Sequence, residues 1–122
     1  MHTLHIKRVY DPPEPSDGRR VLVDRLWPRG LSKERAGLHL WLRDIAPSDE
    51  LRKRYHGGHL GWEEFRDCYF RELFDKGELV ESLLSLQKEA NVTLLYSSRE
   101  PERNNAAALR EFLLEARGYH AG

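Results

Sequence analysis

The segment VLVDRLWPRG, residues 21–30, decides the fold because it joins an apolar run to a polar turn. Its first three residues are apolar, which is typical of a strand covered on both faces of a parallel sheet. An acid, two arginines and a tryptophan follow, and a proline and a glycine mark the turn. Polar residues at the carboxyl end of a strand lie where open α/β sheets bind ligands. The segment therefore predicts an α/β fold and the position of a site.

Four segments have the pattern of short strands. Residues 3–10 and 38–43 alternate apolar and polar side chains, and residues 92–96 form a compact β-rich run. The segment at about residues 20–26 is the fourth, and a stiff, proline-rich loop at residues 11–18 separates it from the first. Since a helical segment precedes the apolar strand at 92–96, a parallel crossover is expected.

Helical patterns occupy most of the remaining chain. Serine caps predict one helical turn after Ser32 and a short helix from Ser48 to about Tyr55. Apolar side chains at helical spacing predict three further helices, over residues 62–77, over residues 79–90, and after residue 102 to a stop at Gly118. We therefore predict an α/β fold: one three-layer domain over residues 1–122, with a mostly parallel sheet of about four short strands and flanking helices.

Charge and composition narrow the functional classes. The chain has twenty basic and twenty acidic side chains, so its overall field gives no strong attraction to DNA or to anionic membranes. Its single cysteine, Cys68, excludes an intramolecular disulfide framework and fits a reducing compartment. No apolar run approaches the roughly 20 residues that span a bilayer, and the N-terminus lacks the apolar core of a signal peptide. We expect a soluble cytoplasmic protein without membrane contacts.

The candidate site lies where two predicted strands end. If the strands at 20–26 and 92–96 are parallel, their carboxyl ends emerge at one edge, near the start of the final helix. Arginine suits carboxylate and phosphate groups, and a helix N-terminus adds backbone N–H donors. These features predict an anion-binding pocket. Its predicted residues are Asp24, Arg25, Trp27, Arg29, Tyr96, Ser97, Arg99 and Asn104.

Each of these side chains has an expected role. The arginines would clamp the anion, namely Arg25, Arg29 and Arg99. Asp24 would orient an arginine or act as a general base, the one catalytic role considered. Ser97 and Asn104 would orient the ligand, and Trp27 and Tyr96 would wall the pocket. The structural alternative is an ion pair between Asp24 and an arginine that holds the sheet edge, with Trp27 packed over it.

The sequence lacks the motifs of several well-known classes of enzyme and binding site. The chain has no G-x-G-x-x-G, no G-x-x-x-x-G-K-[ST] and no G-x-S-x-G, which sets aside dinucleotide, P-loop and nucleophile-elbow chemistry. His56 and His59 have no nearby ligands that would complete a tetrahedral metal set, so no metal site is predicted. Cys68 is expected to be an inert side chain. No motif indicates a cofactor.

The segment RVLVDRLWPRG at residues 20–30 and several others resemble the YeaO-like proteins of bacteria, a branch of a broader bacterial and archaeal family of unknown function. The resemblance implies a compact α/β domain in the cytosol and supplies no reaction. Many relatives carry Asn-His where this chain has Asn104-Asn105, so a histidine-dependent mechanism is not expected at that place. The segments that carry the resemblance are residues 7–10, 17–18, 20–30, 41–42, 46–48, 50–52 and 93–97.

Two functional hypotheses follow. The first is a protein, either an enzyme or a binding protein, that holds a small phosphorylated or carboxylated ligand at the arginines. The second is a non-catalytic interaction or regulatory module, which includes nucleic-acid binding, in which the same arginines contact a partner. An enclosed pocket favours the first hypothesis, and a flat basic face that includes residues 7–8, 19–20 and 52–54 favours the second. The sequence leaves the oligomeric state open.

Overall fold

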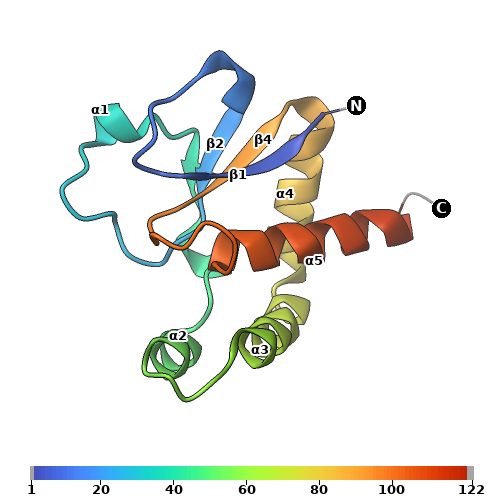
Figure 1. Cartoon of the computed structure of the whole chain (residues 1–122). Helices are drawn as coiled ribbons and strands as arrows, with labels where there is room; N and C mark the ends of the chain where they lie inside the picture. The colour runs from blue at the N-terminus through green and yellow to red at the C-terminus, as the bar shows by residue number, and fades with distance from the viewer. Residues whose placement is uncertain (1, 121–122) are drawn as a thin grey trace.

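The computed structural model describes the backbone of residues 2–120 and the side chains of residues 2–117. A four-stranded sheet with the order β1-β4-β2-β3 lies at its centre (Figure 1). All three strand pairs are parallel, which confirms the predicted α/β fold. The strands are β1 (Leu4–Arg8), β2 (Arg19–Leu22), β3 (Leu40–Trp41) and β4 (Val92–Tyr96).

Strand β4 occupies the interior of the sheet, and all five of its residues are buried. Its register places Leu95 opposite Leu22 of β2, and Tyr96 opposite Arg8 of β1. The carboxyl ends of β1, β4 and β2 therefore meet at one edge of the sheet. The polar residues that follow β2 and β4 in the sequence are brought to the same place.

Three helices cover one face of the sheet: α3 (Trp62–Phe74), α4 (Gly77–Glu89) and α5 (Asn105–His120). The main core lies between them and the sheet, and its fully buried members include Tyr69, Leu83, Leu94 and Leu109. The short helix α2 (Asp49–His56) packs beside α3. Its cap is the predicted one, because Ser48 Oγ accepts the Leu51 N–H at 3.2 Å.

Loops and single-turn helices cover the other face. They include η1 (Pro15–Asp17) and α1 (Lys33–Ala36), and they enclose a smaller core around Leu22 and Leu95. Arg20 is buried there; its guanidinium pairs with Asp17 at 2.8 Å and donates from Nε to the Ala36 carbonyl at 3.0 Å. The third layer is therefore held by an internal ion pair and has no long helix within residues 2–120.

Some predicted boundaries are wrong by a few residues. The helix expected over 62–77 ends at Phe74, and Gly77 is instead the first residue of α4. The last helix continues through Gly118 to His120, because a glycine weakens a helix by about 1 kcal/mol without removing a backbone hydrogen bond. The strands at 20–26 and 38–43 are shorter than expected, because ladder pairing stops where the chain turns at η2 (Arg43–Ile45) and after Leu22.

Within residues 2–120, no helix combines the length and the apolar character needed to cross a membrane.

Candidate functional site

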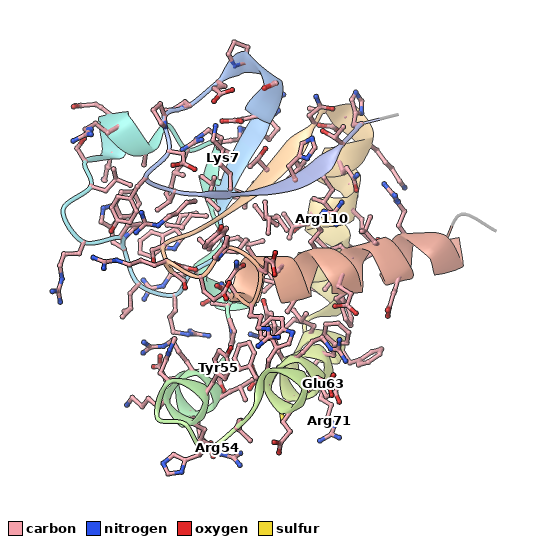
Figure 2. All side chains as sticks on the ribbon, viewed as in Figure 1. Lys7, Arg54, Tyr55, Glu63, Arg71 and Arg110 are labelled. Carbon is pink, nitrogen blue, oxygen red and sulfur yellow. The ribbon has the colours of Figure 1, made fainter. Side chains whose placement is uncertain are left out.

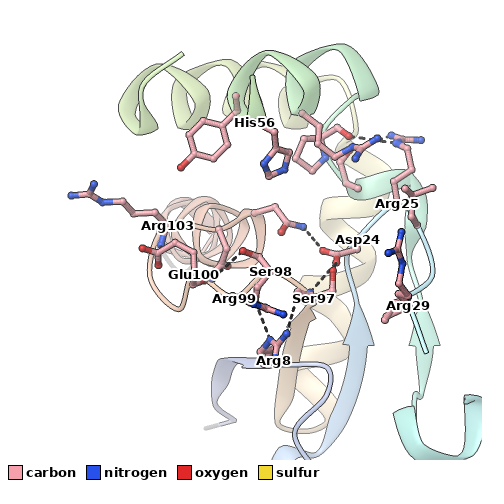
Figure 3. A pocket seen from close by; sticks show the side chains of 18 of the residues that line it. Arg8, Asp24, Arg25, Arg29, His56, Ser97, Ser98, Arg99, Glu100 and Arg103 are labelled. Carbon is pink, nitrogen blue, oxygen red and sulfur yellow. Dashed lines mark hydrogen bonds between the residues drawn. The ribbon is translucent and has the colours of Figure 1, made fainter. Parts of the chain in front are cut away.

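A cleft of about 910 Å³ lies at the carboxyl ends of β1, β4 and β2 (Figure 3). Its walls come from the loop after β2, the loop between β4 and α5, and one side of α2. The chain leaves β2 toward the loop-covered face and leaves β4 toward the helical face. Neighbouring parallel strands whose connections diverge in this way create a crevice that commonly binds ligands. The cleft lies where the sequence predicts a site.

Positive charge is concentrated in the cleft although the whole chain has no net charge. Six arginines line it, against the two carboxylates of Asp24 and Glu100. The arginines are Arg8, Arg25, Arg29, Arg52, Arg99 and Arg103.

Three of the six arginines have guanidinium groups that no hydrogen bond or ion pair from the described residues engages, although the charge of Arg103 also attracts the Glu100 carboxylate. The side chains of Arg29, Arg99 and Arg103 make no hydrogen bond or ion pair with any residue that the structure describes, and all three residues are exposed. Figure 3 shows Arg103 on one side of Asp24 and Arg29 on the other. These three groups can donate to a ligand without first losing a protein partner. Two of them, Arg29 and Arg99, are among the predicted clamps.

Arg8 and Arg25, in contrast, hold the walls of the cleft. Arg8 donates to the carbonyls of Ser97 and Ser98 at 3.4 and 3.2 Å and lies over the Tyr10 ring. The third predicted clamp, Arg25, donates to the backbone carbonyls of residues 46 and 47 at 3.3 and 3.4 Å. Its guanidinium is therefore already engaged in positioning the loop before α2.

Arg52 is the third engaged arginine. Its Nη2 donates to Asp49 at 3.2 Å, within the first turns of α2. Its Nε is buried without a hydrogen-bond partner. Arg52 therefore adds charge to the cleft while its outer nitrogen is held by α2.

The Asp24 carboxylate is held by neutral donors. Ser97 donates to Asp24 Oδ2 from its backbone N–H at 2.9 Å and from its Oγ at 2.6 Å. Asn105 donates from Nδ2 to Asp24 Oδ1 at 3.0 Å. No lysine, arginine or histidine of the described chain forms an ion pair or hydrogen bond with this carboxylate. The ion pair considered as a structural alternative is therefore not formed.

The indole of Trp27 packs within the wall of the cleft that the loop after β2 forms. It packs edge-on against Trp41 with ring centroids 5.4 Å apart, and its Nε1 donates to the Leu31 carbonyl at 2.7 Å. Trp41 in turn donates from Nε1 to the backbone carbonyl of Asp24 at 2.8 Å. The two indoles thus fix the backbone at the start of the loop after β2.

Glu100 shapes the loop between β4 and α5. Its Oε2 accepts the backbone N–H groups of Glu102 at 2.6 Å and of Arg103 at 3.0 Å. These hydrogen bonds lower the pKa of the Glu100 carboxyl below its ordinary value. The side chain is therefore charged at neutral pH and holds the loop that carries Arg99 and Arg103.

Asn104 and Tyr96 do not take the positions that their predicted roles require, which were to orient the ligand and to wall the pocket. Asn104 is the buried N-cap of α5: its Oδ1 accepts the Ala107 N–H at 2.8 Å, and its Nδ2 donates to the Glu100 carbonyl at 2.8 Å. It reaches the cleft wall, but both its Oδ1 and its Nδ2 already make one hydrogen bond within the loop and the helix. Tyr96 is buried in the main core and does not line the cleft. Burial raises the pKa of its phenol.

The structure brings all predicted residues except Tyr96 together at the cleft and adds several that the sequence analysis missed. Arg8 ends a strand next to β4, so the same strand-end rule would have found it. The additions on α2 had no sequence signal, because they reach the cleft only through tertiary packing. The predicted residues that line the cleft are Asp24, Arg25, Trp27, Arg29, Ser97, Arg99 and Asn104, and the main additions are Arg8, Arg52, His56, Arg103 and Asn105.

No metal-binding group of three or more His, Cys, Asp or Glu side chains is found in the part of the chain that the structure describes.

Fold and cleft together define a small parallel α/β protein with an arginine-lined cleft at its strand ends. The chain belongs to the family described as the inactive DUF488-N3 subclade, whose model matches residues 3–121. It is 44% identical over 110 residues to the uncharacterized protein YeaO of Escherichia coli, which covers 90% of this chain and 96% of that protein.

Mycobacterial relatives are similar over the same length. Uncharacterized proteins of Mycobacterium tuberculosis and Mycobacterium bovis are each 40% identical over 110 residues, which is 90% of this chain and 92% of each relative. No solved structure matches the chain.

Proposed function

We propose that the protein binds a small anionic ligand, phosphorylated or carboxylated, in the cleft at the ends of β1, β4 and β2. The observation that carries this proposal is the set of three unpartnered guanidinium groups, those of Arg29, Arg99 and Arg103, at the cleft of a chain without net charge. Guanidinium groups form charge-assisted hydrogen bonds with carboxylate and phosphate oxygens. The N-terminus of α5 adds a favourable dipole on the same side.

Two observations favour binding over chemistry. Three of the roughly four acceptor sites of the Asp24 carboxylate are already occupied by donors of Ser97 and Asn105, which leaves it little capacity to take a proton from a ligand. The family is described as an inactive subclade. A binding protein that makes no covalent change in its ligand fits both.

The distribution of the other basic residues supports a small ligand over a nucleic-acid surface. Arg20 is buried in an ion pair with Asp17, and Lys7 contacts the same carboxylate at 3.1 Å. Neither side chain is free to contact a phosphate backbone. The cleft volume of about 910 Å³ lies within the range of about 300–1,000 Å³ that is typical of small-molecule sites.

Calorimetric titration with inorganic phosphate and with citrate at low salt tests the proposal. We expect one of these anions to bind, and its affinity to fall as salt is added because screening weakens the attraction. The triple variant Arg29→Ala, Arg99→Ala, Arg103→Ala should weaken binding by at least about tenfold, since one charge-assisted hydrogen bond contributes about 1.5–3 kcal/mol. These side chains have no protein partner, so the thermal unfolding of the variant should match that of the parent.

The matched control is Arg71→Ala. Arg71 is an exposed arginine on α3 that lies outside the cleft (Figure 2). The variant Arg71→Ala removes the same kind of charge. We expect its affinity for the anion to stay within about twofold of that of the parent. The triple variant removes three charges and the control removes one, so a loss of binding free energy in the control of one third or more of the loss in the triple variant would show a general charge effect. That result would contradict the proposal, as would the absence of binding by both anions.

A further inference from the structure

The floor of the cleft is formed by Asp24, Ser97 and Asn105, whose side chains offer a ligand acceptors and no free donors. Both Ser97 donors, N–H and Oγ–H, point to Asp24 Oδ2. The Asn105 amide donates to the Val23 carbonyl and to Asp24 Oδ1, each at 3.0 Å. Ser97 Oγ and Asn105 Oδ1 receive no hydrogen bond from the described residues.

The Asp24 carboxylate also retains one lone-pair site. Its two oxygens can accept about four hydrogen bonds, and three are occupied. No cation is paired with this carboxylate, so its negative charge repels an anionic group that approaches the floor. The floor therefore selects groups that donate hydrogen bonds and carry no negative charge, such as hydroxyls.

The rim of the cleft, formed by Ser98, Arg29, Arg99 and Arg103, has the opposite character. Its three guanidinium groups are exposed and unpartnered, whereas the floor residues are only partly exposed. The Ser98 hydroxyl accepts the Glu100 N–H at 3.1 Å, which leaves its own proton for a ligand. Donors and positive charge thus lie at the rim, and acceptors and negative charge lie at the floor.

We propose that the ligand is a phosphate monoester whose body carries hydroxyl groups, with the phosphate at the rim and the hydroxyls on the floor. This inference rests on the proposed function and names its ligand class. A phosphate monoester has more acceptor oxygens and more charge than a carboxylate, so it uses several arginines at once. The hydroxyls donate to Ser97 Oγ, Asn105 Oδ1 and the open site on Asp24.

The cleft is large enough for two kinds of hydroxyl-bearing phosphate monoester. Its volume of about 910 Å³ is near the upper end of the usual range, so a free sugar phosphate and a nucleoside monophosphate both fit by size. Both carry a phosphate next to a hydroxyl-bearing sugar. His56 lies at the α2 side of the cleft, where the base of a nucleotide would stack (Figure 3).

Titration of the unmodified protein with four probes tests the inference: inorganic phosphate, n-butyl phosphate, ribose 5-phosphate and adenosine 5′-monophosphate. Ribose 5-phosphate or the nucleotide should bind at least about tenfold more tightly than n-butyl phosphate, which has no hydroxyl on its body; this is the effect of one well-made hydrogen bond. Tighter binding of the nucleotide would identify a nucleotide as the source, and tighter binding of ribose 5-phosphate a free sugar phosphate.

A variant at Ser97 separates the contribution of the floor to ligand affinity from that of the rim. Ser97→Ala removes the Oγ acceptor together with the Oγ–H that donates to Asp24 Oδ2, and it keeps the backbone N–H that holds the same oxygen. It should reduce the affinity for the hydroxyl-bearing probe several-fold and leave that for n-butyl phosphate within about twofold. Asp24→Asn is less suitable, because an amide nitrogen facing the Ser97 donors would disturb the fold.

The outcomes distinguish the two proposals. If n-butyl phosphate binds as tightly as both hydroxyl-bearing probes, the inference about the ligand class is overturned while anion binding stands. If Ser97→Ala weakens all phosphates equally, the floor does not select hydroxyls and the inference also fails. If none of the four probes binds, the inference about the ligand class is overturned, and the proposed function is overturned with it only if citrate also fails to bind.

Discussion

Asn105, the first residue of α5, donates from one amide nitrogen to the Asp24 carboxylate and to the Val23 carbonyl, each at 3.0 Å. Through this contact, the last helix is tied to the end of β2. The same contact orients Asp24 at the floor of the cleft. Stability and site geometry therefore depend on one carboxamide.

Replacing Asn105 tests this link. Asn105→Ala should lower the free energy of unfolding by about 1–3 kcal/mol, because it leaves a carbonyl and a carboxylate without their donor. Asn105→Asp should cost more at pH 7 than at pH 4, because two facing carboxylates repel one another until one is protonated. Urea unfolding at both pH values measures this. An equal loss at the two pH values would show that the Asp24 contact is not the cause.

Arg25 should contribute to stability more than to anion binding. Its guanidinium holds the backbone carbonyls of Ala46 and Pro47, with Lys76 donating to the same Ala46 oxygen at 2.9 Å. Arg25→Ala should lower stability by about 1–2 kcal/mol. It should change phosphate affinity less than Arg99→Ala, whose side chain has no protein partner. The reverse order in the titration would show that Arg25 leaves the loop to hold the ligand.

The buried ion pair of Asp17 and Arg20 should control acid stability. Burial raises the pKa of the Asp17 carboxyl, but hydrogen bonds from the Glu14 N–H, from Arg20 and from Lys7 outweigh it, so the pKa lies below its ordinary value of 3.8. A carboxylate with a lowered pKa stabilises the fold above the ordinary value, and this contribution is lost as the pH falls through the folded-state pKa. Unfolding measured from pH 6 to pH 2 should show this loss.

Asp17→Asn provides the comparison for that pH profile. It leaves the Arg20 charge buried without its partner and should cost about 3–5 kcal/mol at pH 7. The difference between the parent and the variant should shrink as the pH falls from 3.8 through the lower folded-state pKa, because the carboxyl of the folded parent is then protonated as well. A constant difference over the whole range would contradict the assigned role of Asp17.

Gly18 should not tolerate a side chain. Its φ is 63°, and an added Cβ would overlap the carbonyl of Asn91, which accepts the Arg19 N–H at 2.7 Å in the same place. Gly18→Ala therefore combines backbone strain of about 1–3 kcal/mol, since φ 63° with ψ −126° is a sparsely populated conformation, with an overlap that costs about 1–3 kcal/mol more.

Gly58→Ala is the matched control for that overlap. Gly58 also has a positive φ, 80°, but nothing lies within 4 Å of its added Cβ. Gly58→Ala should show the strain alone. The midpoint temperature of thermal unfolding should therefore be clearly lower for Gly18→Ala than for Gly58→Ala. Equal losses would mean that the chain near Asn91 moves freely to accept the methyl group.

Local patterns in the sequence predict the sheet and the place of the cleft. Residues 21–23 and 92–96 are apolar runs, and such runs indicate strands buried on both faces. Because parallel strands end at one edge, the polar residues after each run had to meet. Arg8 follows the same rule at the end of β1, although its sequence neighbours suggested a solvated basic pair.

The neighbouring asparagines show what local patterns do not resolve. Successive residues of a helix point about 100° apart, so a shift of one position decides which side chain faces β2. Asn104 caps α5 and points to its own loop, whereas Asn105 reaches Asp24. The prediction named the residue next to the one that makes the contact.

The sequence by itself determined the parallel α/β architecture and the edge at which the arginines gather, because both depend on short-range hydrophobic patterns and on strand direction. Only the tertiary structure decided which arginines are free for a ligand. The carbonyls that engage Arg25 belong to residues 46 and 47, and those that engage Arg8 belong to residues 97 and 98. A guanidinium is satisfied by acceptors far away in the chain, and no local pattern records where these acceptors come to lie.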